Sequence, residues 1–148
     1  MKTKVLMVCL GNICRSPLAE GILQAKVDPE NVFVDSAGTG GYHIGNPPDP
    51  RSIAVAKKHG LDIENQRCRQ FQKSDFKKFD VIYAMDRSNL NNILNLADSP
   101  DDAKKVKLLL TEVELPVIEV PDPYWDDNGF EKVFQLIDTA CTSIAKKL

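Results

Sequence analysis

The chain has 148 residues, of which 43% are hydrophobic and 27% are charged. This composition is ordinary for a globular protein, and the length fits one domain, which we place at residues 1–148. With 19 Lys and Arg against 21 Asp and Glu, the formal net charge of -2 argues against general attraction to nucleic acid or to an anionic membrane. The apolar runs are far shorter than the ~20 residues of a membrane helix, and the first residues enter a strand pattern without a signal cleavage site, so we expect a cytoplasmic protein.

Four cysteines, at positions 9, 14, 68 and 141, are too few for a disulfide framework. They form no C-x2-C pair and no Cys/His cluster with the spacing of zinc ligands. The cysteines therefore serve either core packing or thiol chemistry.

The first half of the chain predicts two strands separated by a helix. Residues 4–9 (KVLMVC) form a short apolar run, and the loop 10–14 joins this strand to a helix for which Ser16 is a suitable N-cap and Pro17 a suitable first residue. Residues 32–37 predict the second strand. It runs into a loop rich in Gly and Pro, residues 38–50, which we expect to form a wall of a site and in which His43 reads as an ordinary loop residue.

The second half continues the alternation of helices and strands. We expect a helix over residues 51–59, a strand over 79–84, a helix over 86–97 and a long C-terminal helix from Phe130 to Leu148. Residues 104–110 and 115–120 are both strand-like, and the pattern leaves open that only one of them lies in the main sheet. The alternation indicates a three-layer α/β domain, in which a parallel sheet has right-handed crossovers and helices on both faces.

Ligands of such sheets bind beyond the carboxyl ends of the strands, so the segment after the first strand is the first candidate site. Residues 9–16 read C-L-G-N-I-C-R-S. A short loop before a helix points successive backbone N–H groups into one concavity that suits the oxygens of a phosphate. Arg15 would hold two of these oxygens through its planar guanidinium, and Cys9, which ionises readily in such a field, would be an in-line nucleophile. The alternative for Cys9 is a small buried core residue.

Hydrolysis of a phosphate ester also requires an acid that protonates the leaving oxygen. The best candidate is Asp122, which two prolines hold in a rigid turn beside two aromatic residues that could sandwich a flat substrate ring. The alternative is an ordinary Pro-Asp-Pro turn before the last helix.

Three motifs together resemble the low-molecular-weight protein tyrosine phosphatases: C-L-G-N-I-C-R-S at 9–16, D-S-A-G-T at 35–39 and D-P-Y-W at 122–125. Their order and spacing match along essentially the whole chain. The resemblance implies a four-stranded parallel sheet with a phosphate-binding loop after the first strand, and no metal or cofactor. It also implies hydrolysis of phosphotyrosine in proteins and peptides, and of aryl phosphates, through a phosphocysteine intermediate with inorganic phosphate as the product. We expect a monomer.

The resemblance assigns each site residue a role. Cys9 would be the nucleophile, Arg15 the phosphate clamp, and Asp122 the general acid that then activates water as a base. Cys14 would also protect an oxidised Cys9 by forming a disulfide with it. By the same similarity Asn12 would hold the shape of the loop, Ser36 would support Asn12, and Ser16 would stabilise the thiolate. Other loop residues would help to bind the substrate, namely Leu10, Gly11, Ile13 and Cys14. An aromatic slot would be lined by Tyr42, Tyr124 and Trp125.

One position departs from the family pattern. Many relatives carry a histidine where this chain has Gln66, which cannot titrate, so a histidine–glutamate pair with Glu20 is in doubt. His59 lies at a helix end, where it serves either as a cation near the negative terminus or in support of catalysis.

Other functions of the same or a different class remain as alternatives. A protein-arginine phosphatase of this fold would be expected to have threonine in place of Ile13, and a thioredoxin-linked arsenate reductase would need two further cysteines close together. A non-hydrolytic phosphate-binding or phosphocarrier module would not need Asp122.

Overall fold

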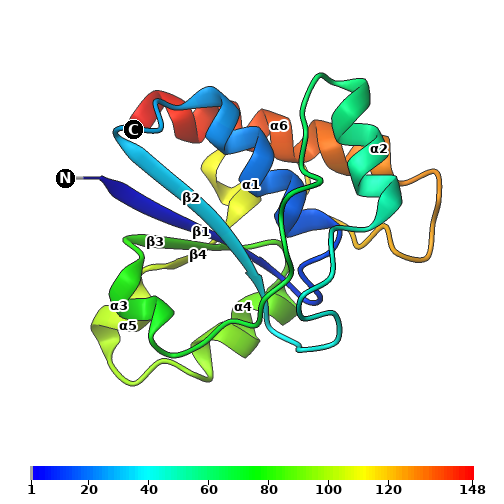
Figure 1. The fold of residues 1–148 in the computed structure, drawn as a ribbon. Coiled ribbons are helices and arrows are strands. Elements are labelled where there is room, and N and C mark those ends of the chain that lie inside the picture. Colours follow the sequence, from blue (N-terminus) through cyan, green and yellow to red (C-terminus); the bar gives the residue numbers. More distant parts are fainter. Residues whose placement is uncertain (1) are drawn as a thin grey trace.

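The computed structural model describes residues 2–148 and contains one parallel sheet of four strands (Figure 1). The strands are β1 (Thr3–Cys9), β2 (Val32–Gly38), β3 (Val81–Ala84) and β4 (Val106–Leu108), and their order across the sheet is β2-β1-β3-β4. All neighbouring pairs are parallel, which confirms the α/β class expected from the alternation of strands and helices.

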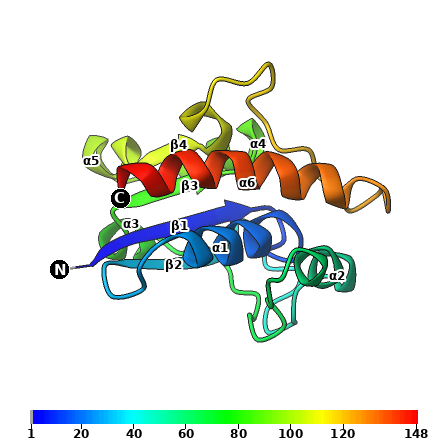
Figure 2. The ribbon, with the colours of Figure 1, turned by 90° about the horizontal axis from the view of Figure 1, so that it is seen from above.

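Helices cover both faces of the sheet (Figures 1 and 2). On one side lie α1 (Arg15–Lys26), α2 (Pro50–Lys58) and α6 (Phe130–Lys147), and on the other α3 (Asp75–Lys78), α4 (Arg87–Leu94) and α5 (Pro100–Lys104). None of the helices within residues 2–148 has the length and apolar character needed to cross a membrane.

The central strand β1 separates two hydrophobic cores. Its side chains alternate between the faces of the sheet, so Val5 and Met7 pack in the core under α1 and α6, whereas Leu6 and Val8 pack in the core with α3 and α4. A strand buried on both faces needs no polar positions, which explains why its buried part, residues 5–9, is an uninterrupted apolar run.

The order of the strands reverses at β1. The chain goes from β1 to β2 on one side, and later to β3 on the other side. The segments that follow β1 and β3 therefore meet at the carboxyl edge of the sheet, where ligands of such folds bind.

The start of α1 differs from the prediction, because Ser16 is not its N-cap. The helix begins at Arg15 with Cys14 at the N-cap position, and no side chain caps it. The hydroxyl of Ser16 instead lies beside the sulfur of Cys9 and accepts a hydrogen bond from the side chain of Asn12. The helix N–H groups are thus left for another partner.

Several element boundaries also differ from the sequence prediction. Only the first of the two strand-like segments joins the sheet: β4 covers Val106–Leu108, a 3-10 helix follows at Leu109–Glu112, and residues 115–120 form no strand. The helix expected over 86–97 is shorter, since α4 ends at Leu94. The two short helices α3 and α5 were not predicted, because four or five residues are too few to show a helical period.

Candidate active site

The loop 10–14 is held by its carbonyl groups. Carbonyl oxygens of Cys9 and of the loop accept hydrogen bonds from residues of other segments, namely the N–H groups of Thr39, Gly40 and Asp49, the hydroxyl of Ser52 and the thiol of Cys68. Since the carbonyl groups are bound from outside, the N–H groups are left on the inside of the turn. The amides of Gly11, Ile13, Cys14 and Arg15 have no acceptor within residues 2–148. This is the arrangement that binds an anion.

Asn12 takes the strained conformation that turns the loop. Its φ is 57°, in the left-handed region that few residues other than glycine adopt, and its N–H donates to the sulfur of Cys9 at 3.3 Å. Gly38, at the end of β2, lies directly behind the turn: a Cβ atom there would be 2.7 Å from the carbonyl oxygen of Leu10. The D-S-A-G-T motif therefore supplies a glycine where the loop backbone approaches closely.

A buried hydrogen-bond network orients the side chain of Asn12. The N–H of Arg69 donates to Asn12 Oδ1 at 3.0 Å, so the amide nitrogen Nδ2 faces two hydroxyl groups, Ser16 Oγ at 2.8 Å and Ser36 Oγ at 3.0 Å. Ser16 Oγ accepts from Asn12, and two acceptors lie within reach of its own proton: Cys9 Sγ at 3.0 Å and the carbonyl oxygen of Ala37 at 3.5 Å. The sulfur of Cys9 thus faces an N–H group and a hydroxyl, an environment that suits an anionic sulfur.

The network ends at Glu20. Ser36 donates to Glu20 Oε1 at 2.6 Å, and burial raises the pKa of Glu20 to about 7, although the hydrogen bond from Ser36 opposes the rise. Gln66 does not pair with this carboxyl group; its amide donates to the backbone oxygen of Pro17 at 3.0 Å. The carboxyl group of Glu20 therefore has no histidine partner at the position where relatives are expected to carry one.

Arg15 is fixed by one of its guanidinium nitrogens. Its Nη1 donates to Asp86 Oδ2 at 2.6 Å and to the carbonyl oxygen of Val120 at 3.0 Å, and the side chain is only 3% exposed. Burial works against its charge, but Cys9 and Asp86 outweigh burial and raise the pKa of Arg15. The Nε and Nη2 atoms form no hydrogen bond within residues 2–148, which leaves a planar edge with two donors for a ligand.

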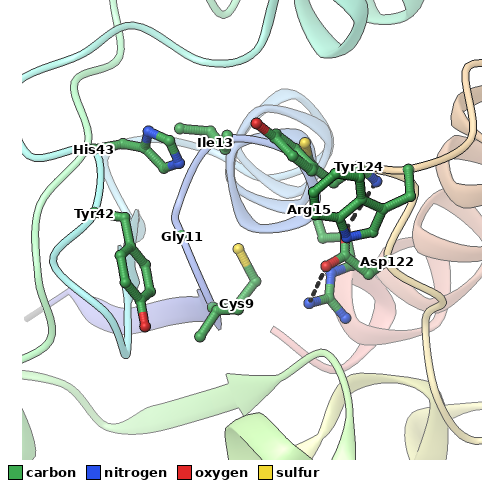
Figure 3. A pocket seen from close by; sticks show the side chains of 11 residues that line it. Cys9, Gly11, Ile13, Arg15, Tyr42, His43, Asp122 and Tyr124 are labelled. Carbon is green, nitrogen blue, oxygen red and sulfur yellow. Dashed lines mark hydrogen bonds and ion pairs between the residues drawn. The ribbon is translucent and has the colours of Figure 1, made fainter.

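Asp122 lies opposite the loop, on the segment between β4 and α6. One carboxylate oxygen accepts the N–H of Tyr124 at 3.0 Å, and the other lies 3.9 Å from Arg15 Nη2 (Figure 3). Its side chain is 40% exposed. The turn therefore directs the carboxyl group to the cavity in which Arg15 ends.

These groups enclose one cavity of about 370 Å³. The sulfur of Cys9 points into it, and Tyr42 and Tyr124 stand on opposite sides (Figure 3). The lining residues are Cys9, Leu10, Gly11, Ile13, Cys14, Arg15, Tyr42, His43, Asp122, Tyr124 and Trp125. Of the residues proposed from the sequence, Asn12, Ser16 and Ser36 do not line the cavity but hold the loop from behind.

The rim of the cavity is aromatic and open to solvent. Tyr42 is 74% and Trp125 is 88% exposed, and the rings of Tyr124 and Trp125 meet edge to face with centroids 4.8 Å apart. His43, which read as an ordinary loop residue, also lines the cavity beside Gly11. A flat substrate group that enters the cavity would pass between Tyr42 and Tyr124 and then reach the loop 10–14.

The other cysteine of the loop, Cys14, is buried. Burial, followed by the nearby charges of Asp49, Cys9 and Asp122, raises the pKa of Cys14 to about 12. Cys14 therefore remains a neutral thiol at physiological pH.

Some residues that hold the site were missed in the sequence. Asp86 anchors Arg15, while Cys68 and Arg69 bind the backbone and the side chain of Asn12. The position of Asp86 was a usable signal, because it lies two residues after the end of β3, at the carboxyl edge of the sheet. Nothing local marks the other two.

His59 lies outside the cavity lining. Its Nε2 is 2.9 Å from Glu131 Oε2, and its ring stacks on Phe134 with centroids 4.1 Å apart. It also forms the C-cap of α2. This position agrees with the predicted place at a helix end, and it lies away from the cavity where support of catalysis was the alternative.

Comparisons with known proteins identify similar sequences and a similar fold. The family model of low molecular weight phosphotyrosine protein phosphatase matches residues 4–148. The low molecular weight phosphotyrosine protein phosphatase 1 of Drosophila melanogaster is 42% identical over 156 aligned positions, which cover 99% of this chain and 97% of the relative. The human low molecular weight phosphotyrosine protein phosphatase is 40% identical over positions that cover 97% of this chain and 94% of the relative. A crystal structure of a protein tyrosine phosphatase from Entamoeba histolytica, with Hepes in the active site, superposes with a TM-score of 0.93 at 36% identity and covers 99% of this chain and 96% of that one.

Proposed function

Because the chain belongs to the low molecular weight phosphotyrosine protein phosphatase family, and is thus a protein-tyrosine phosphatase and a phosphoric monoester hydrolase, we propose that Cys9, Arg15 and Asp122 carry out its reaction. The observation that carries the proposal is that the sulfur of Cys9, the unbonded loop amides, the guanidinium and the carboxyl group all border one cavity. Its substrates are phosphoproteins. We assign phosphotyrosine in proteins and peptides as the substrate group, since the two tyrosine rings leave a slot for a flat aryl ring.

In the first step the phosphate of the substrate binds to the loop amides and to the free edge of Arg15. The thiolate of Cys9 attacks phosphorus, the bond from phosphorus to the phenolic oxygen breaks, and Asp122 gives its proton to that oxygen. The product alcohol leaves and a phosphocysteine remains. The loop N–H groups and Arg15 stabilise the charge on the equatorial oxygens of the transition state, where fixed donors have the largest effect.

In the second step Asp122, now a carboxylate, removes a proton from water. The resulting hydroxide attacks phosphorus, the sulfur–phosphorus bond breaks, and inorganic phosphate is released with Cys9 again a thiolate. The hydroxyl of Ser16, 3.0 Å from Cys9 Sγ, donates a hydrogen bond to the departing sulfur and stabilises it. Every group that these steps use comes from one chain, so we propose that a monomer suffices.

The chemistry also favours a reducing compartment. All four cysteines are free thiols in the structure, and a thiolate nucleophile works only while it stays reduced. We therefore assign the protein to the cytoplasm.

The experiment that tests the proposal compares the turnover of phosphotyrosine, phosphoserine and phosphoarginine by the wild type and by the Cys9→Ser variant. The wild type should act on phosphotyrosine by preference. The variant should lose turnover yet keep its fold by circular dichroism, because a serine hydroxyl fits the loop but is not ionised at neutral pH. Substantial activity of the variant would remove Cys9 from the mechanism, whereas preferred turnover of phosphoarginine would move the substrate assignment to the alternative enzyme of this fold.

A further inference from the structure

The first turn of α2 is bound directly to the loop 10–14. The backbone N–H of Asp49 donates to the carbonyl oxygen of Ile13 at 2.8 Å, and the hydroxyl of Ser52 donates to the carbonyl oxygen of Cys14 at 3.2 Å. The carboxylate of Asp49 in turn caps the helix by accepting the N–H of Arg51 at 2.8 Å. The start of α2 therefore has a fixed position relative to the phosphate-binding loop.

Arg51 extends from this turn to the segment that carries Asp122. Its Nε and Nη2 donate to the two carboxylate oxygens of Asp49 at 3.0 and 2.9 Å, and its Nη1 donates to Asp127. The guanidinium also lies over two rings, 5.5 Å from the centroid of Tyr124 and 4.7 Å from that of Phe130. One planar group thus contacts α2, the cavity wall and the start of α6.

The segment 121–128 has few other polar contacts with the rest of the protein. Within residues 2–148, its hydrogen bonds and ion pairs to other segments come from two side chains, Arg15 at Asp122 and Arg51 at Asp127. Its remaining hydrogen bonds are local turns, such as the one between Tyr124 and Asp122. Arg15 is a substrate-binding group, so Arg51 is the contact that can hold this segment independently of the substrate.

We propose that Arg51 is a positioning residue that sets the place of Asp122 and Tyr124 over the phosphate-binding loop. This inference rests on the role of Asp122 as the general acid. It assigns Arg51 no contact with the substrate: the guanidinium is held to Asp49 and Asp127 and is absent from the cavity lining. The ion pair of Arg51 with Asp127, whose side chain is 83% exposed, adds little to stability, so the loss of this pair should appear in the geometry of the reaction rather than in the free energy of unfolding.

The test measures kcat/KM of the Arg51→Gln variant with two aryl phosphates, one with a poor leaving group, phosphotyrosine, and one with a good one, 2,4-dinitrophenyl phosphate. We expect about a tenfold loss with phosphotyrosine, because a displaced acid no longer protonates the leaving oxygen efficiently, and less than a threefold loss with the second substrate. Arg51→Lys should have an intermediate kcat/KM with phosphotyrosine, because a lysine keeps the charge but cannot hydrogen-bond to Asp49 and Asp127 together or stack on the rings.

A matched control is available on the same helix. Lys58 also forms an exposed ion pair with the start of α6, through Glu131 at 3.1 Å, but it forms no hydrogen bond or ion pair with the segment 121–128. Lys58→Gln should therefore leave kcat/KM unchanged for both substrates.

A double-mutant cycle separates positioning of the acid from a general loss of structure. In an Asp122→Asn background, Arg51→Gln should cost less than threefold further with phosphotyrosine, because the acid is already lost and only the effect on Tyr124 remains. An equal loss in both backgrounds, or an equal loss for both leaving groups, would overturn the proposal. If the wild type itself does not hydrolyse phosphotyrosine, the proposed function is wrong. If the wild type does and Arg51→Gln has the same kcat/KM, only the proposed role of Arg51 is wrong.

Discussion

Replacement of Glu20 by glutamine should change how the stability of the protein depends on pH. Burial raises the pKa of Glu20 from the ordinary value of 4.5 to about 7; the hydrogen bond from Ser36 opposes the rise and the nearby charge of Asp35 adds to it. In the unfolded chain the carboxyl group returns to its ordinary pKa. Between these two values the folded state therefore binds more protons than the unfolded state.

The sign of the effect follows from this difference in bound protons. The contribution of Glu20 to the free energy of unfolding is fully present below about pH 4.5 and is lost as the pH rises through 7. Since one pKa unit corresponds to about 1.4 kcal/mol, the wild type should lose roughly 2.5 kcal/mol from this group between pH 5 and pH 8. A glutamine does not titrate, yet its amide oxygen can still accept the hydroxyl of Ser36.

Urea unfolding of the wild type and of Glu20→Gln at pH 5, 6, 7 and 8 measures this effect. The free energy of unfolding of the wild type minus that of the variant should fall steadily with pH, with most of the change below pH 7. Glu114→Gln, at an exposed carboxylate, is the matched control and should give a difference that stays constant. A constant difference for Glu20→Gln as well would show that this carboxyl group titrates normally and would refute the reasoning.

Three further substitutions test the roles of the site residues. Arg15→Lys should lower kcat with 4-nitrophenyl phosphate at least a hundredfold, because an ammonium group cannot bind Asp86 and two phosphate oxygens together; a variant within threefold of the wild type would contradict this. Asp122→Asn should lower kcat/KM for phosphotyrosine by roughly 10²–10⁴ and much less for substrates whose leaving groups need no proton, so equal losses would exclude Asp122 as the acid. Cys14→Ser should keep most activity but should recover less activity than the wild type when dithiothreitol is added after peroxide. In the wild type the neutral thiol of Cys14 condenses with a sulfenic acid on Cys9, which releases water and leaves a disulfide that dithiothreitol can reduce. Equal recovery of the two proteins, or no Cys9–Cys14 cross-link by mass spectrometry, would contradict this role.

The sequence predicts the part of the site that lies within one short segment. Cys9, the loop and Arg15 follow one another at the junction of a strand and a helix, so their local order already implies their geometry. The parallel sheet could be predicted for a similar reason, since apolar runs and helical periods alternate along the chain. Asp122 could be proposed only because the reaction requires a general acid. It lies more than a hundred residues from Cys9 in the sequence, and the fold brings both to one cavity.

The contacts that hold Arg15 and the loop could not be predicted in this way. The sequence predicted Asp86 only as the first residue of a helix; its carboxylate caps α4 and also accepts the hydrogen bond from Arg15. Ser16 shows the opposite case: a serine before a proline is typical of an N-cap, yet the turn of the loop places its hydroxyl beside Cys9. A polar side chain has several possible partners, and only the tertiary arrangement decides which it meets.

The site contains residues that meet the substrate and other residues that only hold the loop, which explains why contacts far from the substrate matter. Residues in front of the loop meet the substrate, whereas Ser36, Cys68 and Arg69 hold it from behind through Asn12. Donors that are already oriented cost no reorganisation when charge develops in the transition state. A substitution behind the loop should therefore lower the rate without any contact with the substrate, because it turns the loop amides away from the position of the phosphate oxygens.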